Sequence, residues 1–346
     1  MKRKVLVIGG GVAVLAFASM FGGYTTWNSM SPDRSCASCH EIRSRVDTFH
    51  SSAHQELKCT DCHGTALSYG FHSLMEKANM VFTHVSEDVE AEDVRMNEAQ
   101  VLQVHEACVN CHQSAAAKWA VGGHATTYRD IFLDEEHNKM EAPYADCFRC
   151  HGMYYDGTIK ELMSPLDTKG PWTFHDPEKA DHYAVPCLAC HEMHSPQPTQ
   201  AQFAHLEDRF QKRNPGYSLY SRPDKMHLRV DTMVVPDMFH DGKPVMVSED
   251  PVEALCIRCH SPNHAHIAGT EDDKTPVGVH EGLSCASCHE PHSNNPMNSC
   301  TDCHPAVSNC NLDVQRMDTS FANPDSANDI HSVSCADCHG DEKVRS

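Results

Sequence analysis

The sequence predicts a mainly α-helical chain with extensive loops, little or no sheet, and a core packed largely by bound cofactors. The pattern Cys-x-x-Cys-His occurs nine times in 346 residues, and aromatic residues make up only 7% of the chain. The mean hydropathy is −0.50. A chain of this length ordinarily builds two domains around apolar cores. Because apolar side chains are scarce here, we expect flat apolar groups held at the motifs to supply much of the core.

The nine motifs use 18 of the 19 cysteines. In this pattern the two thiols form thioethers with the vinyl groups of a haem, and the adjacent histidine becomes an axial ligand of the iron. A zinc site would pair two such cysteine pairs and would not need a histidine after every second cysteine. Disulfides within a motif would close loops too small to stabilise the fold much. The chain therefore resembles the multihaem c-type cytochromes, which implies nine covalently attached haems.

The residues of this prediction follow from the motifs. The predicted thioether cysteines are Cys36, Cys39, Cys59, Cys62, Cys108, Cys111, Cys147, Cys150, Cys187, Cys190, Cys256, Cys259, Cys285, Cys288, Cys300, Cys303, Cys335 and Cys338. The predicted axial ligands that follow them are His40, His63, His112, His151, His191, His260, His289, His304 and His339. Cys310 is left without a motif partner and is expected to be a buried thiol.

Histidines outside the motifs are candidates for the second axial position of each iron. Of the 27 histidines, nine belong to motifs, which leaves 18 for nine positions. Ligation by two histidines gives low reduction potentials that suit an electron relay. Position along the chain favours eight of them, either just before a motif, where they can ligate a neighbouring haem, or just after one, or in the stretches between: His54, His84, His124, His182, His194, His280, His292 and His331.

The amino terminus has the features of a membrane anchor. Lys2, Arg3 and Lys4 precede an apolar run from Val5 to about Gly23, which is about the length that crosses a bilayer as a helix. We expect residues 1–28 to anchor the chain in the cytoplasmic membrane, with the haem-bearing part in the periplasm. The alternative is a signal peptide that is cleaved after residue 18, which would release a soluble periplasmic protein.

Motif spacing predicts how the rest of the chain is organised. Residues 29–155 carry four motifs, 156–255 carry one, and 256–346 carry four in close succession. We expect a tetrahaem module, a middle segment with one haem, and a carboxy-terminal tetrahaem cluster. Apolar residues at spacings of three and four predict helix within 66–104. Turns are expected at 214–216 and 241–242, where Asn-Pro-Gly and Asp-Gly occur.

The arrangement of residues 1–155 resembles the NapC/NirT family of membrane-anchored tetrahaem quinol dehydrogenases. An anchor helix, the motif at Cys36, the motif at Cys59 and a helix containing Lys77 follow in the same order. The resemblance implies that menaquinol is oxidised near the first haem and that Lys77 forms part of the quinol site. Ile42 and His84 depart from the family pattern, and His84 could instead ligate the first iron. The segment 285–304 resembles the doubled motif units of many multihaem cytochromes.

The formal charge of −20 makes nucleic acid a poor partner and favours a redox partner with a basic docking surface. We therefore expect the chain to carry electrons from the quinol pool to a periplasmic or outer partner, such as a reductase or another multihaem cytochrome. Quinol dehydrogenase activity would make it an enzyme. One alternative is a pure periplasmic relay without quinol oxidation. The other, a multihaem reductase of a small inorganic substrate, is disfavoured because no motif ends in lysine.

Overall fold

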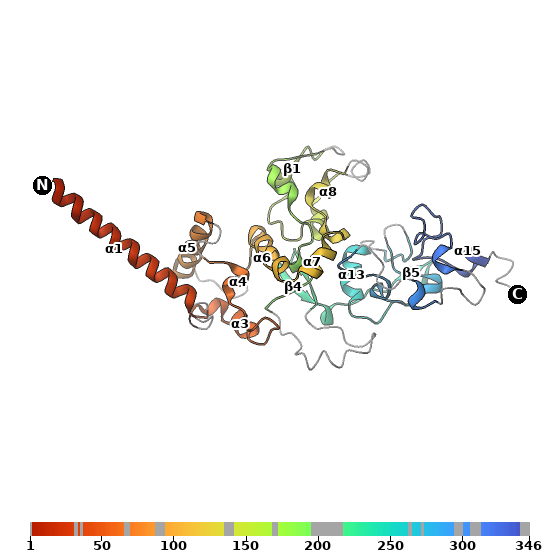
Figure 1. Cartoon of the computed structure of the whole chain (residues 1–346). Coiled ribbons are helices and arrows are strands. Elements are labelled where there is room, and N and C mark those ends of the chain that lie inside the picture. The colour runs from red at the N-terminus through yellow and green to blue at the C-terminus, as the bar shows by residue number, and fades with distance from the viewer. Residues whose placement is uncertain are drawn as a thin grey trace. The chain divides into compact units, whose positions relative to one another are not determined.

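The computed structural model describes most of the chain (Figure 1). The described residues are 2–30, 34, 37–65, 70–86, 94–134, 142–167, 172–194, 217–261, 265–270, 273–293, 300–304 and 313–339, with side chains at 2–9, 27–28, 70–77, 231, 302 and 338–339 left out. The chain divides into two compact units. Unit 1 comprises residues 1–107 and 193–197, and unit 2 comprises residues 108–192 and 198–346.

Short helices joined by loops dominate both units, and sheet is limited, within the described residues, to three two-stranded pairs. The predicted fold class, mainly α with extensive loops, is therefore confirmed. The helices of unit 1 are α1 (Lys2–Ser29), α3 (His40–Phe49), α4 (Cys59–His63), α5 (Gly70–Ser86) and most of α6 (Glu98–Cys111). Those of unit 2 are α7 (Gln113–Trp119), α8 (Tyr128–Phe132), α10 (Phe148–His151), α11 (Ile159–Leu162), α13 (Glu253–His260), α14 (Cys285–Cys288) and α15 (Cys335–His339).

The amino-terminal helix α1 is continuous over its 28 residues. Within the described part of the chain, however, no helix has the length and apolarity that crossing a membrane requires. The transmembrane span expected at residues 1–28 is therefore not found there. The helix expected over 66–104 is present as two separate helices, α5 and the start of α6, and residues 94–97 between them are not helical.

Local sequence signals explain where several elements of unit 2 begin and turn. Thr127 precedes α8 and its hydroxyl and backbone N–H both donate to Asp130, three residues later. Such reciprocal capping satisfies amide groups that the first helical turn leaves unpaired. Strands β5 (Phe239–His240) and β6 (Lys243–Pro244) pair across Asp241 and Gly242, whose φ angles are 50° and 72°. Positive φ at both central residues is the type I′ hairpin geometry, so the turn predicted there is confirmed. The turn predicted at 214–216 lies outside the described residues.

An apolar core lies in unit 2 around the fourth motif and the segment that follows it. Eleven buried side chains form one cluster: Tyr128, Phe132, Phe148, Tyr155, Ile159, Leu162, Met163, Trp172, Phe174, Ala180 and Ala184. Strands β1 (Met163–Ser164) and β2 (Thr173–Phe174) contribute to it and pair antiparallel. This part of the chain therefore has an apolar core built from protein side chains.

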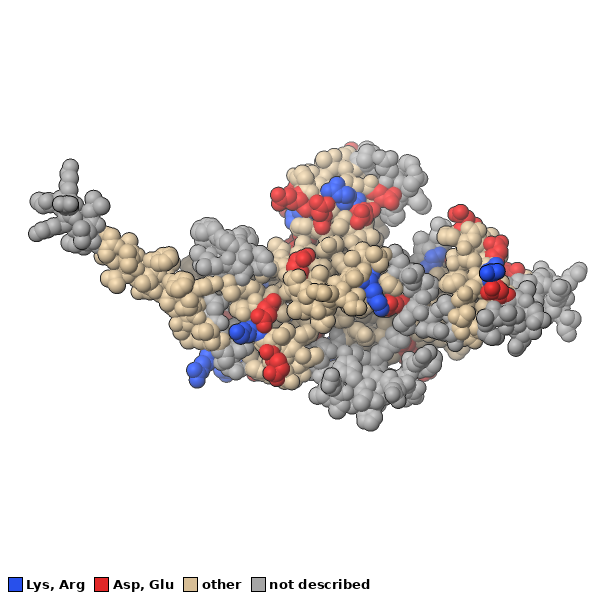
Figure 2. Space-filling model, viewed as in Figure 1, with Lys and Arg blue, Asp and Glu red and all other residues tan. Residues whose placement is uncertain are grey.

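Figure 2 shows Asp and Glu interspersed with fewer Lys and Arg on the face in view, in keeping with the net negative charge of the chain.

Candidate metal centres

Each motif that the structure describes lies on or beside a single helical turn. The second, sixth, seventh and ninth motifs occupy α4, α13, α14 and α15, and the fifth and eighth lie on 3-10 turns at Cys187–Ala189 and Cys300–Asp302. The backbone N–H of the motif histidine donates to the carbonyl of the first cysteine, at 2.7 Å in the third motif and 2.9 Å in the seventh. Residues three apart share one helix face, so both thiols of a motif face the same side.

The sixteen cysteines whose side chains are described form no disulfides. Cys36, Cys310 and Cys338 lie outside that set. The disulfide alternative considered for the motifs is therefore not seen among the described cysteines.

Five imidazole pairs each bring one motif histidine beside one non-motif histidine. The ring centroids lie 6.1 Å apart for His63–His194, 6.0 Å for His191–His292, 6.0 Å for His260–His124, 6.1 Å for His289–His331 and 6.5 Å for His304–His280. An ion that binds two opposite imidazoles, each at about 2.0 Å, holds their centroids roughly 6.3 Å apart. The gap between each pair of rings therefore fits one iron ion.

Four of the non-motif histidines are oriented by a hydrogen bond at Nδ1. The Nδ1 atom of His194 lies 2.9 Å from the carbonyl oxygen of Arg45, and that of His124 lies 2.9 Å from the carbonyl oxygen of Pro291. The Nδ1 atom of His280 lies 3.2 Å from the carbonyl oxygen of Ile330. The Nδ1 atom of His331 lies 2.9 Å from a carboxylate oxygen of Asp329. A carbonyl or carboxylate partner fixes Nδ1 as the protonated nitrogen and presents Nε2 to a metal. These side chains are therefore oriented as metal-binding imidazoles usually are.

The protonation of several paired histidines also suits ligation. Burial, together with repulsion from the nearby His292 and His112, lowers the pKa of His191 to about 4. Burial likewise lowers the pKa values of His260, His289 and His292. A lowered pKa keeps imidazole neutral, and neutral imidazole is the form that binds metal.

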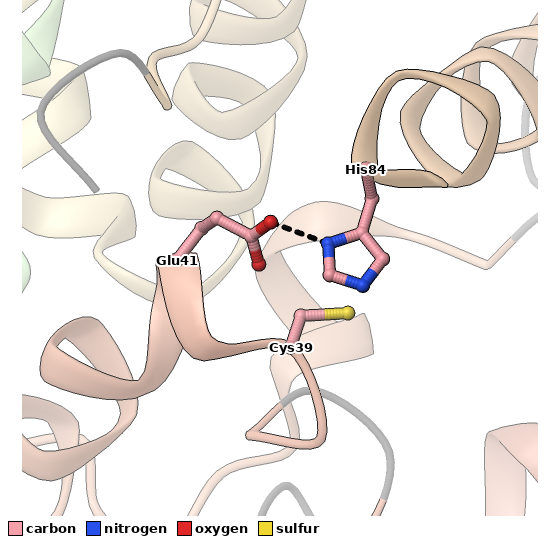
Figure 3. A group of neighbouring side chains, drawn as sticks. All are labelled: Cys39, Glu41 and His84. Carbon is pink, nitrogen blue, oxygen red and sulfur yellow. Dashed lines mark hydrogen bonds and ion pairs between the residues drawn. The ribbon is translucent and has the colours of Figure 1, made fainter. Parts of the chain in front are cut away.

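The histidine pair at the first motif differs from the five pairs described above (Figure 3). Glu41, at the start of α3, and His84, near the end of α5, point toward one another and are hydrogen-bonded through His84 Nδ1, with Cys39 close by. The ring centroids of His40 and His84 lie 5.6 Å apart, and a Glu41 oxygen lies 3.5 Å from His40 Nε2. Hydrogen bonds from its own backbone and from His84 lower the pKa of Glu41, which favours the carboxylate. An ion near His40 would therefore meet a carboxylate as well as imidazole.

Motifs distant in sequence approach one another within unit 2. The Cys150 and Cys259 thiols lie close enough to shift each other's pKa values in opposite directions, so the fourth motif lies beside the sixth. The Cys256 thiol likewise raises the pKa of Cys285, so the seventh motif also lies beside the sixth. In addition, Arg149 of the fourth motif donates to the carbonyl of Arg258 in the sixth at 2.6 Å. The sixth motif is thus in contact with two others.

The remaining predicted residues are placed as follows. His182 lies with its ring 6.1 Å from that of Tyr128, and its carbonyl accepts from the Tyr128 N–H at 3.0 Å. His54 lies in the loop after α3, where its N–H donates to Ser52 Oγ at 3.1 Å. His112 and His151 lie at the ends of α6 and α10. The side chains of Lys77 and His339 lie outside the description.

Sequence reasoning missed the carboxylates that face candidate ligands. Glu41 directly follows a motif histidine, and Asp329 stands two residues before His331. Both are acidic neighbours of histidines in the sequence, so this adjacency is a signal that could have found them. The carbonyl partners have no sequence signal, because every residue carries that group.

Comparison with known proteins gives one match. A family model described as outer membrane cytochrome MtrC/MtrF-like, domains II/IV, matches residues 29–206, a stretch that includes the first five motifs. No curated protein and no solved structure matches the chain. The match supports a multihaem c-type cytochrome and does not extend to the NapC/NirT family.

Proposed function

The chain belongs to the outer membrane cytochrome MtrC/MtrF-like family, domains II/IV, and on this premise we propose that it is a nonahaem relay between the membrane quinol pool and a periplasmic or outer redox partner. Membership makes it a multihaem c-type cytochrome with covalently bound haem that functions in electron transfer, with its haem-bearing part outside the cytoplasmic membrane. The number of haems, the quinol donor and the acceptor belong to the proposal.

The five imidazole pairs carry the proposal. Each bound haem supplies a reversible one-electron couple. The motif cysteines would hold it by thioethers, and the paired histidines would both ligate its iron. Iron with both imidazoles bound would be closed to oxygen and small substrates, so a centre of this kind would transfer electrons rather than transform a ligand. This favours a relay over a reductase.

The distal ligands follow from the pairs. We assign His194 to the second motif, His292 to the fifth, His124 to the sixth, His331 to the seventh and His280 to the eighth. His84 is assigned to the first motif, where Glu41 also lies. His54 and His182 stay candidates for the remaining motifs.

Contacts between motifs support a relay within unit 2. The neighbouring cysteines of the fourth and sixth motifs, and of the sixth and seventh, support this because they would hold separate haems side by side. Electrons could then pass between those haems without large movements of the protein. The sixth motif is the junction of this arrangement.

Haem content and spin state test the relay. We expect intact-mass measurement of the matured chain to give nine haems, and the electron paramagnetic resonance spectrum to be mainly low-spin. His194→Ala should convert one haem to a high-spin form. His175→Ala is the matched control, because His175 is exposed and its Nε2 lies 3.0 Å from Ser164 Oγ instead. Fewer haems, or a His194→Ala spectrum identical to the control, would contradict the assignment.

The quinol donor is tested separately. Oxidised protein is mixed with menaquinol, and the haem absorbance is followed by stopped flow in the wild type, Lys77→Ala and the exposed control Lys160→Ala. Fast reduction that only Lys77→Ala slows supports quinol oxidation in the amino-terminal part. If menaquinol leaves the haems oxidised while dithionite reduces them, the donor is another redox protein. Quinol lies in the bilayer, so flotation of the full chain with membranes accompanies this test.

A further inference from the structure

A buried carboxyl lies between the sixth and seventh motifs and has no part in ligation. Glu253 begins α13, and only 1% of its surface is exposed. One of its oxygens accepts from the backbone N–H of Cys285 at 3.1 Å, and the other lies 3.3 Å from Cys285 Sγ. Cys285 begins α14 and is a predicted thioether residue. Glu253 is thus in direct contact with an attachment site.

The groups that face Glu253 disfavour its charged form. Burial is the largest influence and raises the pKa of Glu253, while its hydrogen bonds with Cys285 oppose the rise. Asp250, in the loop before α13, and the fully buried Asp273 raise the pKa further by repulsion. Both charged groups on the neighbouring segments are therefore acidic. A carboxylate in such surroundings binds a proton readily.

Haem attachment strengthens this tendency. The thiol of Cys285 can donate its hydrogen to Glu253, whereas a thioether sulfur has no hydrogen and acts only as a weak acceptor. After attachment, a hydrogen bond across the 3.3 Å between the carboxyl oxygen and Cys285 Sγ can form only when the carboxyl is protonated. Attachment therefore favours the neutral acid that donates to sulfur.

We propose that Glu253 takes up a proton when the haem attached at Cys285 is reduced and releases it when that haem is oxidised. This inference rests on the proposed relay function. The electron comes from the quinol or reduced redox protein that feeds the relay, and the proton comes from solvent. The carboxylate becomes a carboxylic acid, and no other bond forms or breaks. Reduction removes one positive charge beside Glu253, and loss of that charge favours the neutral acid.

The coupling has a measurable consequence. Because reduction consumes a proton, the reduction potential of the coupled haem falls as pH rises. The fall approaches about 59 mV per pH unit between the pKa of Glu253 in the oxidised protein and its higher pKa in the reduced protein. Outside that range the potential is independent of pH.

Redox-difference infrared spectroscopy of the haem-loaded full chain, combined with potentiometry over a series of pH values, tests the proposal. On reduction we expect a protonated-carboxyl C=O band in the wild type. Glu253→Gln should abolish the band and make the potential of one haem independent of pH. Glutamine can accept from the Cys285 N–H and donate to sulfur, so it mimics the neutral acid. Glu249→Gln, an exposed neighbour four residues earlier, should leave both signals unchanged.

A second variant keeps the test decisive if Glu253→Gln does not load haem. Asp250→Asn removes a repelling charge, so the pH range of the coupling should move to lower pH. A band that persists in Glu253→Gln, or a pH range that Asp250→Asn does not move, would overturn the proposal. Failure of the proposed relay looks different, because it would appear in the wild type as missing haems or a high-spin spectrum. Normal haem reduction without these effects sinks the inference on Glu253 alone.

Discussion

Removing the charge of Asp329 should raise the reduction potential of one haem. The Asp329 carboxylate accepts from His331 Nδ1 at 2.9 Å and pairs with Lys274 Nζ at 2.9 Å. An anionic partner makes imidazole a stronger donor to iron, which stabilises the oxidised state. Asp329→Asn keeps an acceptor oxygen and removes only the charge. The haem assigned to His289 and His331 should then be easier to reduce.

The magnitude follows from the strength of the hydrogen bond. A hydrogen bond to a charged group contributes about 1.5–3 kcal/mol and a neutral one about 0.5–1.5 kcal/mol. The difference of about 1–1.5 kcal/mol corresponds to about 40–60 mV for one electron. Lys274 offsets part of the charge and Asp329 is one-third exposed, so we expect a rise of about 20–60 mV, with screening by solvent at the lower end.

Spectroelectrochemical titration of the haem-loaded chain measures the shift. The matched control is Asp318→Asn, since Asp318 is exposed and lies nearby in sequence. One haem component should shift upward in Asp329→Asn and none in Asp318→Asn. A titration curve unchanged by Asp329→Asn, or shifted equally by both variants, would refute the reasoning that the carboxylate tunes this ligand.

Three further predictions concern stability. Phe148→Ala removes a fully buried ring that packs against Phe132 and Tyr155 and should cost about 3–5 kcal/mol of unfolding free energy, measured by denaturant unfolding. The matched control is Phe239→Ala, because the Phe239 side chain is partly exposed. Equal losses of unfolding free energy in the two variants would argue against a core at Phe148. Partial burial pushes the pKa of Asp329 upward, but hydrogen bonds from the His331 backbone, Lys274 and the His331 ring hold it well below its ordinary value. The ionised Asp329 therefore stabilises the folded state fully above its unfolded pKa of about 3.9, and this stabilisation is lost as pH falls toward the lower pKa of the folded state. In acid unfolding, the stabilities of the wild type and Asp329→Asn should converge at that low pH. A constant difference in stability over the whole pH range would contradict this. Arg129→Ala breaks an exposed pair with Asp181 and should change stability by less than about 0.5 kcal/mol; a thermal shift as large as that of Phe148→Ala would be unexpected.

The motifs could be predicted from sequence because their chemistry is local. Cysteines three residues apart meet on one helical turn wherever the chain goes, and the described motifs all lie on or beside such turns. Six of the eight distal candidates lie beside a motif imidazole in the structure. Their partners were not predictable, since His124 lies beside His260 and His194 beside His63, and such pairings depend on the tertiary fold.

The apolar core around Phe148 was also missed by composition. Its members are spread over residues 128–184, so a low average hydropathy conceals them. The apolar periodicity predicts the presence of helix within 66–104 but not where the helices begin and end. It does not reveal the break before α6, because Val94 and Met96 continue the apolar pattern through a segment that is not helical.

The contacts between cysteines of different motifs bear on the order of assembly. Cys150 lies beside Cys259, and Cys256 beside Cys285. In an oxidising compartment, neighbouring thiols are exposed to oxidation to disulfides, which would block two attachment sites at once. Haem attachment before these segments meet would remove both pairs of thiols from that reaction. We therefore expect maturation to precede folding in unit 2, and a chain that folds first to incorporate fewer haems.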